Sequence, residues 1–206
     1  GIYSSTINGE SWQLKFDSGL NKMAESLAYD NGNVVAVVSG SGVYLSTDKG
    51  ETWNLTQTTG LNFNTSYKSL LLKENTIILS NNNGEMFISP DLGNSWENIS
   101  IISNYHVTND FALINDKLYA ATTKGLKVSS NLGQSWSNFN SNQLYINDIL
   151  FDSDKIYIST STGVYLATDQ EKIWHSICDG MGVLETTALL PIDNTIYAGT
   201  FATGVW

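Results

Sequence analysis

The nine residues "LSTDKGETW" (45–53) decide how the rest of the chain is interpreted. They contain two acids, a lysine, hydroxyls and a tryptophan, a mixture that suits either a compact catalytic centre or a turn that the fold requires. Two further segments of the same kind follow, "ISPDLGNSW" (88–96) and "VSSNLGQSW" (128–136). One domain rarely needs the same catalytic centre three times, so the recurrence favours a structural role.

The tryptophans that end these segments recur at a nearly constant spacing. Successive intervals are 41, 43, 40 and 38 residues, and self-similarity at a fixed period is the signature of a repeat architecture. The five tryptophans are Trp12, Trp53, Trp96, Trp136 and Trp174. Each ends a variant of the pattern S-x-D-x-G-x-[ST]-W, and the chain starts and stops out of phase with this period.

Each period carries the pattern of four short strands. Between Trp53 and Trp96 we expect strands around 53–57, at 67–73 ("YKSLLLK"), at 77–80 ("IILS") and at 85–89 ("EMFIS"). Short β-branched and aromatic runs bounded by Asn, Asp and Gly indicate antiparallel hairpins, and no segment shows a sustained helical period. Four strands per repeat of about 40 residues predict an all-β fold, a β-propeller of four-stranded antiparallel blades.

With these motifs the chain resembles the Asp-box (BNR-repeat) propellers of sialidases, oligoxyloglucan-type glycoside hydrolases, sortilin-type receptors and photosystem II assembly factors. The resemblance covers essentially all 206 residues and implies one propeller domain, 1–206, of about five repeats of about 41 residues. Two outcomes stay open. The terminal "YAGTFATGVW" (197–206) could pair with "GIYSST" (1–6) and close five blades, or the chain could be an arc of a larger propeller.

The resemblance implies that each box forms the turn between the third and fourth strands, away from the face that usually binds ligands. The acidic position is held by Asp48, Asp91, Asn131 as a near substitute, and Asp169, whereas Ile7 departs from it. In the last copy Glu171 and Ile173 replace the usual Gly and hydroxyl. Short acceptors such as Asp48 can bind N–H groups of their own turn, and we expect each tryptophan to pack between neighbouring sheets.

Composition excludes several classes of function. The net charge is −10, with ten lysines and no arginine. Side chains that could contact the phosphates of a nucleic acid are therefore few, and a nucleic-acid partner is disfavoured. Sialidases among the Asp-box propellers bind the carboxylate of their substrate with arginines. Because this chain has no arginine, we expect no sialidase activity. His106 and His175 lack ligand partners at metal-binding spacing, and we expect no metal and no cofactor. No apolar run approaches the roughly 20 residues of a transmembrane helix.

We expect function on the loops between blades, at the end opposite the boxes. The candidate contact residues there are Phe63, Tyr67, Tyr105, His106, Tyr145 and Met181. Rings among Asn and Ser suit a protein or carbohydrate surface. The sequence therefore predicts a non-catalytic binding or scaffold propeller with a protein or glycan partner, either by itself or as part of a larger chain or assembly. The resemblance implies a location outside the cell or on its surface.

A glycoside hydrolase of the oligoxyloglucan type, or a fragment of one, is the alternative. Such an enzyme needs two carboxylates in different environments. The candidates on the loops between blades are Asp17, Asp179 and Glu185, and no pair among them stands out.

Overall fold

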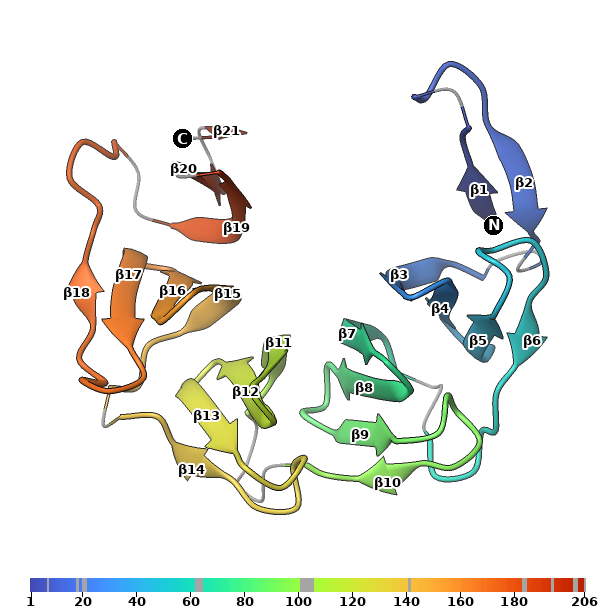
Figure 1. Ribbon diagram of the computed structural model, residues 1–206, viewed down its shortest axis with the longest axis horizontal. Coiled ribbons are helices and arrows are strands. Elements are labelled where there is room, and N and C mark those ends of the chain that lie inside the picture. The colour runs from blue at the N-terminus through green and yellow to red at the C-terminus, as the bar shows by residue number, and fades with distance from the viewer. Residues whose placement is uncertain are drawn as a thin grey trace. The chain divides into compact units, whose positions relative to one another are not determined.

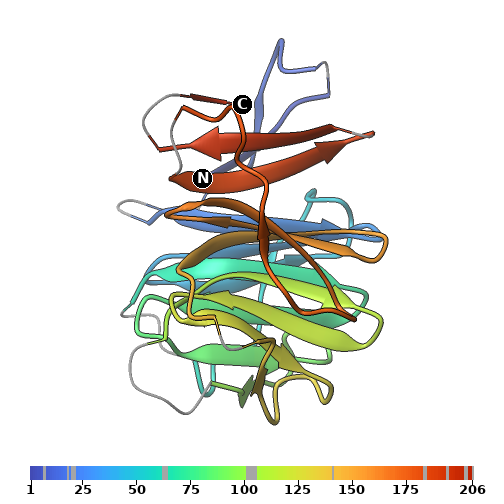
Figure 2. The ribbon, with the colours of Figure 1, turned by 90° about the vertical axis from the view of Figure 1, so that its left-hand side faces the viewer.

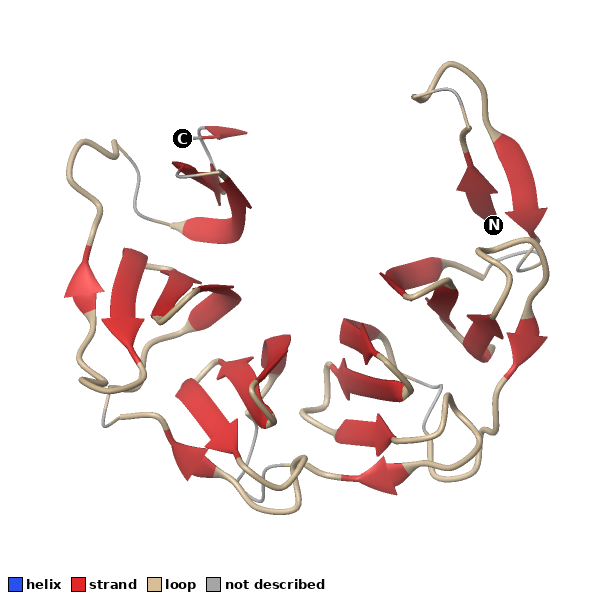
Figure 3. Cartoon of the chain, viewed as in Figure 1, coloured by secondary structure: helices blue, strands red, loops and turns tan. Residues whose placement is uncertain are grey.

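The computed structural model describes residues 1–6, 8–17, 19, 22–61, 65–100, 106–140, 142–182, 185–193 and 195–201, and the backbone of 204–205. Within these residues every regular element is a β-strand (Figure 3). The described chain has no helix with the length and apolar character needed to span a bilayer. The chain divides into two compact units, unit 1 (1–100) and unit 2 (101–206).

Unit 1 contains three antiparallel sheets, labelled in Figure 1. The first has two strands, β1 (Ile2–Ser4) and β2 (Gln13–Phe16). The second is a meander of β3 (Ala24–Asp30), β4 (Asn33–Val38), β5 (Gly42–Ser46) and β6 (Asn54–Leu55). The third is a meander of β7 (Tyr67–Lys73), β8 (Thr76–Asn81), β9 (Met86–Ser89) and β10 (Glu97–Asn98).

Unit 2 repeats the same four-stranded pattern twice and adds a three-stranded sheet. Its first meander is β11 (Thr108–Ile114), β12 (Lys117–Thr122), β13 (Gly125–Ser129) and β14 (Ser137–Asn138). Its second is β15 (Ile146–Asp152), β16 (Lys155–Thr160), β17 (Gly163–Thr168) and β18 (His175–Ser176). The last sheet is β19 (Thr186–Ile192), β20 (Thr195–Thr200) and β21 (Gly204–Val205), whose long β19–β20 hairpin is drawn in red in Figure 2.

The strand prediction for the period from Trp53 to Trp96 is confirmed. β7 spans the predicted 67–73, β8 extends one residue beyond each end of 77–80, and β9 starts one residue late. The outer strand is shorter than predicted, because β6 holds only Asn54 and Leu55. Short strands on a strict meander follow from apolar runs separated by turn-forming residues.

The second strand of each meander is buried on both faces. In β4, residues 35–38 are 0% exposed, as are Ile77, Ile78 and Leu79 in β8. These strands read as continuous apolar runs rather than as alternating patterns, as expected of strands whose two faces are both buried. Each fully buried Val, Leu or Ile side chain contributes about 1.5–3 kcal/mol of gross transfer free energy.

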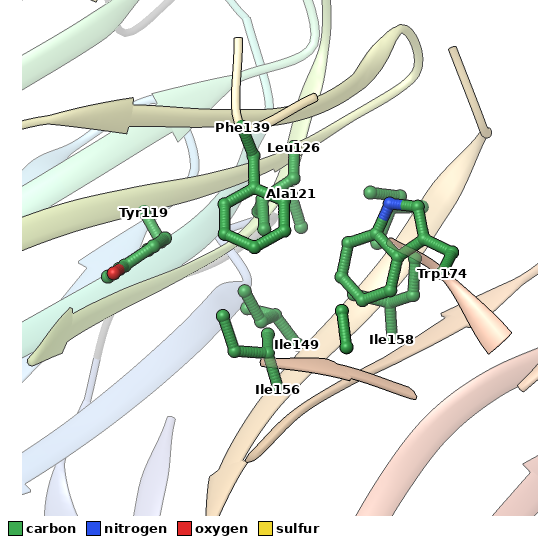
Figure 4. Close-up of a cluster of buried hydrophobic side chains, with 10 residues drawn as sticks. Tyr119, Ala121, Leu126, Phe139, Ile149, Ile156, Ile158 and Trp174 are labelled. Atoms are coloured by element: carbon green, nitrogen blue, oxygen red, sulfur yellow. The ribbon is translucent and has the colours of Figure 1, made fainter. Parts of the chain in front are cut away.

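One apolar cluster forms the core of each unit. In unit 1, Val37, Ile77, Leu79 and Phe87 belong to a cluster that joins the β3–β6 and β7–β10 sheets. The cluster of unit 2, drawn in Figure 4, joins the β11–β14 and β15–β18 sheets in the same way. Its labelled members are Tyr119, Ala121, Leu126, Phe139, Ile149, Ile156, Ile158 and Trp174.

Side chains near a bulge in the first strand bind the first strand of the next sheet. In unit 1, the backbone N–H of Tyr67 donates to Glu25 Oε2 at 2.7 Å. In unit 2, Asn109 Nδ2 donates to the carbonyl of Ile146 at 2.6 Å, and Asn147 Nδ2 donates to that of Thr186 at 2.7 Å. Each of these residues lies at the register shift that begins its inner strand. A bulge re-aims one side chain out of the ladder, and here it links neighbouring sheets.

The predicted box turn forms at 46–53. Ser46 Oγ donates to Asp48 Oδ1 at 2.7 Å and accepts from the N–H of Gly50 at 2.8 Å. Asp48 Oδ1 also accepts from the N–H of Thr52 at 2.8 Å, and Oδ2 accepts from Thr52 Oγ1 at 2.6 Å. These bonds, with those of the Thr52 hydroxyl first, hold the pKa of Asp48 at about 2, below its usual 3.8. The carboxylate therefore accepts hydrogen bonds from its own turn.

The second and third boxes repeat this geometry. Asp91 accepts from Ser89 Oγ at 2.8 Å and from Ser95 N and Oγ at 2.9 and 2.7 Å. Asn131 Oδ1 accepts from Ser129 Oγ at 2.8 Å and from the N–H of Ser135 at 3.0 Å. The hydrogen bond from the Ser95 hydroxyl lowers the pKa of Asp91. The prediction that the boxes are structural turns agrees with these three copies.

The box glycine at position 93 serves a close approach between sheets. Gly93 has φ of +86°, and a Cβ there would lie 2.5 Å from a side-chain carbon of Thr56 in the preceding sheet. Its carbonyl accepts from the N–H of Gln57 at 2.9 Å. Only glycine combines this backbone conformation with this contact.

The tryptophans differ in how deeply they pack. Trp174 is 9% exposed, and its ring centroid lies 5.4 Å from that of Phe139 in the preceding sheet. Trp96 is half-buried, and its Nε1 donates to the carbonyl of Gln57 at 2.9 Å. Half-buried Trp53 packs against Phe16 of β2 at a centroid distance of 5.8 Å.

Trp136 and Trp12 complete the set. Trp136 is half-buried, whereas Trp12 is 63% exposed. The expectation that every box tryptophan is buried between sheets is therefore corrected for Trp12. Its sheet has only the two strands β1 and β2, which offer less surface for the ring to pack against.

Closure of the chain into five blades stays a prediction. In the described residues β1 pairs with β2, and β21 pairs with β20. The two strands β19 and β20 correspond to the first two strands of a meander, and β1 and β2 to the last two. Ile7 and Trp206 lie outside the described residues.

Burial predicts unequal costs of removing two box tryptophans. Trp174→Ala should lower the free energy of unfolding by about 3–5 kcal/mol, because a buried indole leaves a cavity. Trp12→Ala should change it by less than about 0.5 kcal/mol. Urea denaturation followed by tyrosine fluorescence and circular dichroism measures both. Similar losses in the two variants would contradict the packing roles described here.

Candidate functional site

The box at 167–174 is the fourth when the copies are counted from 46–53, and it does not form the turn that the boxes at 46–53, 89–96 and 129–136 share. Ala167 stands where the first box has Ser46, and Ile173 stands where it has Thr52, so both hydroxyls are missing. Glu171 replaces the glycine. The turn instead closes through the N–H of Lys172, which donates to the carbonyl of Thr168 at 3.0 Å. Asp169 is thereby left without the donors that bind the acidic residue in the intact boxes.

Asp169 pairs with a side chain of the neighbouring sheet. Lys117, the first residue of β12, places Nζ 2.6 Å from Asp169 Oδ2. The hydroxyl of Tyr119 donates to Asp169 Oδ1 over a longer 3.5 Å. The Asp169 hydrogen bond is the main cause that raises the pKa of Lys117. Asp169 was expected to be a structural box residue, and this contact corrects that expectation.

The ion pair is accessible to solvent. The side chain of Lys117 is 42% exposed, and that of Asp169 is 41% exposed. Pairs with this exposure contribute only about 0–1 kcal/mol to stability. The fold therefore depends little on the pair, and both groups are available for a ligand.

Two cavities meet at this ion pair. The first, of about 320 Å³, lies between the β11–β12 and β15–β16 hairpins. It is lined by Ile114, Asn115, Lys117, Tyr119, Phe151, Ser153, Asp154, Ile156, Thr168, Asp169 and Gln170. The second, of about 240 Å³, lies beside the third box and is lined by Lys117, Val128, Ser130, Ser135, Trp136, Ser137, Asp169 and Lys172. Because both contain Lys117 and Asp169, we call them together the Lys117–Asp169 groove.

The groove combines apolar floors with polar groups. Phe151 packs against Tyr119 at a centroid distance of 4.7 Å, which fixes its ring in the first cavity. Trp136 lines the second cavity. Hydroxyls and amides surround both rings, and the four charged side chains are two lysines and two aspartates. Apolar surface with a few convergent polar groups is the usual composition of a small-molecule site.

The residues that were expected to bind a partner and that the structure describes do not line this groove. Tyr67 is 5% exposed and belongs to the core of unit 1, so it is a packing residue. Tyr145 is 43% exposed, whereas His106 and Met181 are half-buried. Burial, and after it the charge of Lys127, lowers the pKa of His106. Phe63 and Tyr105 lie outside the described residues.

The groove lies at the box end of the sheets in unit 2. Hairpin tips and box turns meet at this end, whereas His106 and Tyr145 precede β11 and β15 at the other. A signal for the groove was present in the sequence. The fourth box keeps its acid but loses both hydroxyls and the glycine, which marks an Asp that its turn no longer needs. The partner Lys117 could not be identified, because it is far from Asp169 in the sequence.

A second pair of acids in unit 2 acts as a link between sheets. Asp110 in β11 shares a hydrogen bond with Asp148 in β15. Asp148 Oδ2 accepts from the N–H of Leu189 at 2.6 Å, and Asp110 Oδ2 accepts from that of Ile149 at 3.3 Å. Loss of solvation and the neighbouring Asp148 raise the pKa of Asp110 to about 8. The pair thus connects β11, β15 and β19, through the hydrogen bond that the two acids share and through the N–H of Leu189.

Among the residues that the structure describes, no three His, Cys, Asp or Glu side chains gather in a way that could hold a metal ion.

Comparisons with solved structures identify the fold. No protein-family model matches the chain, and no curated protein matches its sequence. An ancestral GH74 enzyme is similar with a TM-score of 0.78 and 19% identity over 100% of this chain and 33% of that one. YCF48 bound to D1 peptide is similar with a TM-score of 0.70 and 12% identity over 96% and 68%.

The WD40 β-propeller domain of Doa1 is also similar, with a TM-score of 0.62 and 14% identity over 88% of this chain and 63% of that one. The chain thus spans between 33% and 68% of the length of these proteins. Likenesses at such low identity show the fold alone. Together with the four-stranded antiparallel sheets, they support a β-propeller fold.

The shared proton of Asp110 predicts a pH dependence of stability. The folded chain keeps this proton up to about pH 8, whereas the unfolded chain loses it near the ordinary aspartate pKa of 3.8. Between these values the unfolded state binds fewer protons, so stability falls as pH rises, by at most about 1.4 kcal/mol per pH unit.

Asp110→Asn supplies a neutral donor at the same place and should reduce this fall between pH 4 and pH 8. Urea unfolding at several pH values measures the effect, with Asp152→Asn at an exposed hairpin position as the matched control. Identical pH profiles for the Asp110→Asn variant and the wild type would show that Asp110 is not protonated in the folded chain.

Proposed function

We propose that this chain is a non-catalytic binding or scaffold propeller that holds a glycan or protein partner in the Lys117–Asp169 groove. The observation that carries the proposal is the accessible ion pair where two cavities of about 320 and 240 Å³ meet. The first cavity lies at the lower end of the volumes of ligand sites, about 300–1,000 Å³, and the second lies just below that range. We further propose, from its Asn-, Ser- and Thr-rich, arginine-free composition, that the chain works outside the cell or on its surface.

The groove lies at the opposite end of the sheets from the loops that the sequence indicated as the binding site. The loops between blades were expected to bind through their aromatic residues, but Tyr67 is buried in a core cluster. The groove at the box end offers rings, hydroxyls, amides and both charges within one concave surface. A concave surface with convergent polar groups is a better binding site than isolated exposed rings.

One similar structure agrees with a binding role for this fold, and another agrees with the hydrolase alternative. YCF48 has been solved with D1 peptide, so a propeller of this shape can hold a protein segment. The GH74 similarity supports the alternative that the chain is a glycoside hydrolase or part of one. One observation in the groove favours this alternative, because Asp154 and Asp169 line the same cavity and glycoside hydrolysis uses a pair of carboxylates.

Loss of the lysine charge tests the proposed site. The purified chain is screened against an array of oligosaccharides and an array of peptides, and affinities for the strongest ligands are measured by calorimetry. Lys117→Met should weaken binding about tenfold or more, since hydrogen bonds to charged groups are worth about 1.5–3 kcal/mol. Lys155→Met, at the equivalent first position of β16, should leave the affinity unchanged.

Binding that survives Lys117→Met but is lost in Tyr145→Ala would place the site at the loops between blades and overturn the proposal. Release of reducing ends from a bound oligosaccharide, abolished in Asp169→Asn, would instead establish the hydrolase alternative.

A further inference from the structure

We propose that the groove binds a neutral saccharide chain, and that the loss of the fourth box creates this site by releasing Asp169 from its turn. The inference rests on the binding function proposed above and specifies its ligand. It assigns Asp169 and Lys117 as the groups that recognise neighbouring hydroxyls of the saccharide.

The fourth box lacks the side chains that bind the acid in the intact boxes. In the second box, Asp91 accepts hydrogen bonds from the hydroxyl of Ser89 and from the N–H and hydroxyl of Ser95. The corresponding positions around Asp169 are Ala167 and Ile173, and Ile173 is 59% exposed. The carboxylate of Asp91 therefore binds its own turn, whereas the carboxylate of Asp169 faces a groove.

The ion pair has bonding capacity left for a ligand. A lysine ammonium has three N–H donors, and one of those of Lys117 is directed at Asp169 Oδ2. Asp169 Oδ1 accepts only a long contact of 3.5 Å from Tyr119 among the bonds described. One hydroxyl can donate to Oδ1 while its neighbour accepts from Nζ, because each alcohol is both donor and acceptor. Two adjacent hydroxyls of a sugar supply this combination.

The charges around the groove favour a neutral ligand. Lys117 and Lys172 are balanced by Asp154 and Asp169. An anion would meet the two aspartates in a chain of net charge −10, and a cation would compete with Lys117 for Asp169. A neutral ligand leaves the pair intact and avoids an unpaired charge.

The two rings indicate a ligand longer than one sugar. Phe151 lines one cavity and Trp136 the other, with the ion pair in the wall that the cavities share. The apolar C–H face of a sugar can cover an aromatic ring while its hydroxyls reach the surrounding amides and serines. A chain of sugars extending across the ion pair would use both cavities.

Restoring the fourth box tests the inference directly. The variant Ala167→Ser/Glu171→Gly/Ile173→Thr supplies the two hydroxyls and the glycine of the intact boxes. The restored turn should bind the Asp169 carboxylate and remove it from Lys117. NMR titration of the Lys117 side chain should then show a pKa lower than that of the wild type, which reports the position of Asp169 without any ligand.

Saccharide binding is measured on the same proteins. Calorimetry with cellohexaose, mannohexaose and chitohexaose, and an array of neutral oligosaccharides, should show about tenfold or more loss of affinity in the restored-box variant. Asp169→Asn, which keeps the size of the side chain, should show a similar loss of saccharide affinity. It provides the test if the restored-box variant does not fold. Glu171→Gly alone, which restores no hydroxyl, should bind as the wild type does.

Each outcome bears on one part of the inference. An unchanged Lys117 pKa in a folded restored-box variant would overturn the role given to the lost box. A lowered pKa with unchanged saccharide affinity would overturn the role given to Asp169. Binding of peptides but of no neutral saccharide, still dependent on Lys117, would overturn the choice of ligand while leaving the proposed binding function in place.

Discussion

Face-to-face burial of the second strands between neighbouring sheets is the interaction on which each unit depends. Residues such as Val37 and Ile77 are fully buried where the β3–β6 and β7–β10 sheets of unit 1 pack face to face. An isolated four-stranded meander would leave both faces of its second strand in water, so the repeats stabilise one another. Bulge residues such as Asn147, whose amide binds the backbone of the next sheet, add hydrogen bonds that fix how adjacent sheets are placed.

The box turns occupy the ends of these sheets and illustrate how one motif can serve two purposes. In three copies the acceptor, as in Asp48, is bound by the hydroxyls and N–H groups of its own turn. The fourth copy keeps the acid and loses these donors, and its carboxylate binds Lys117 instead. A repeat protein can relax its consensus in one copy because the other contacts of that repeat remain, here including the packing of Trp174 on Phe139. The relaxed copy is where the chain differs most from its own pattern.

The sequence predicted the strands and the box turns well because both depend on local chemistry. Apolar runs, turn-forming residues and the fixed period locate β7 and β8 within one residue of the prediction. The candidate site was not predicted, because it depends on which side chains two sheets bring together. Lys117 carries no motif, and its partner is supplied by the turn of another sheet. Tyr67 was expected on the surface because it adjoins a loop, but it begins a strand and packs in the core. The number of strands in each sheet, which leaves Trp12 exposed beside a two-stranded sheet and Trp174 buried, is also absent from a local pattern.

The central claim is that an acid released from its turn builds a ligand groove with Lys117. Amide chemical-shift mapping during titration with a neutral hexasaccharide tests it most directly, because it locates the ligand without altering the protein. We predict the largest shifts at 115–119, 151–156 and 168–172, around the groove. Shifts confined to 106–107, 123–125 and 144–146, at the opposite end of the sheets, would contradict the account.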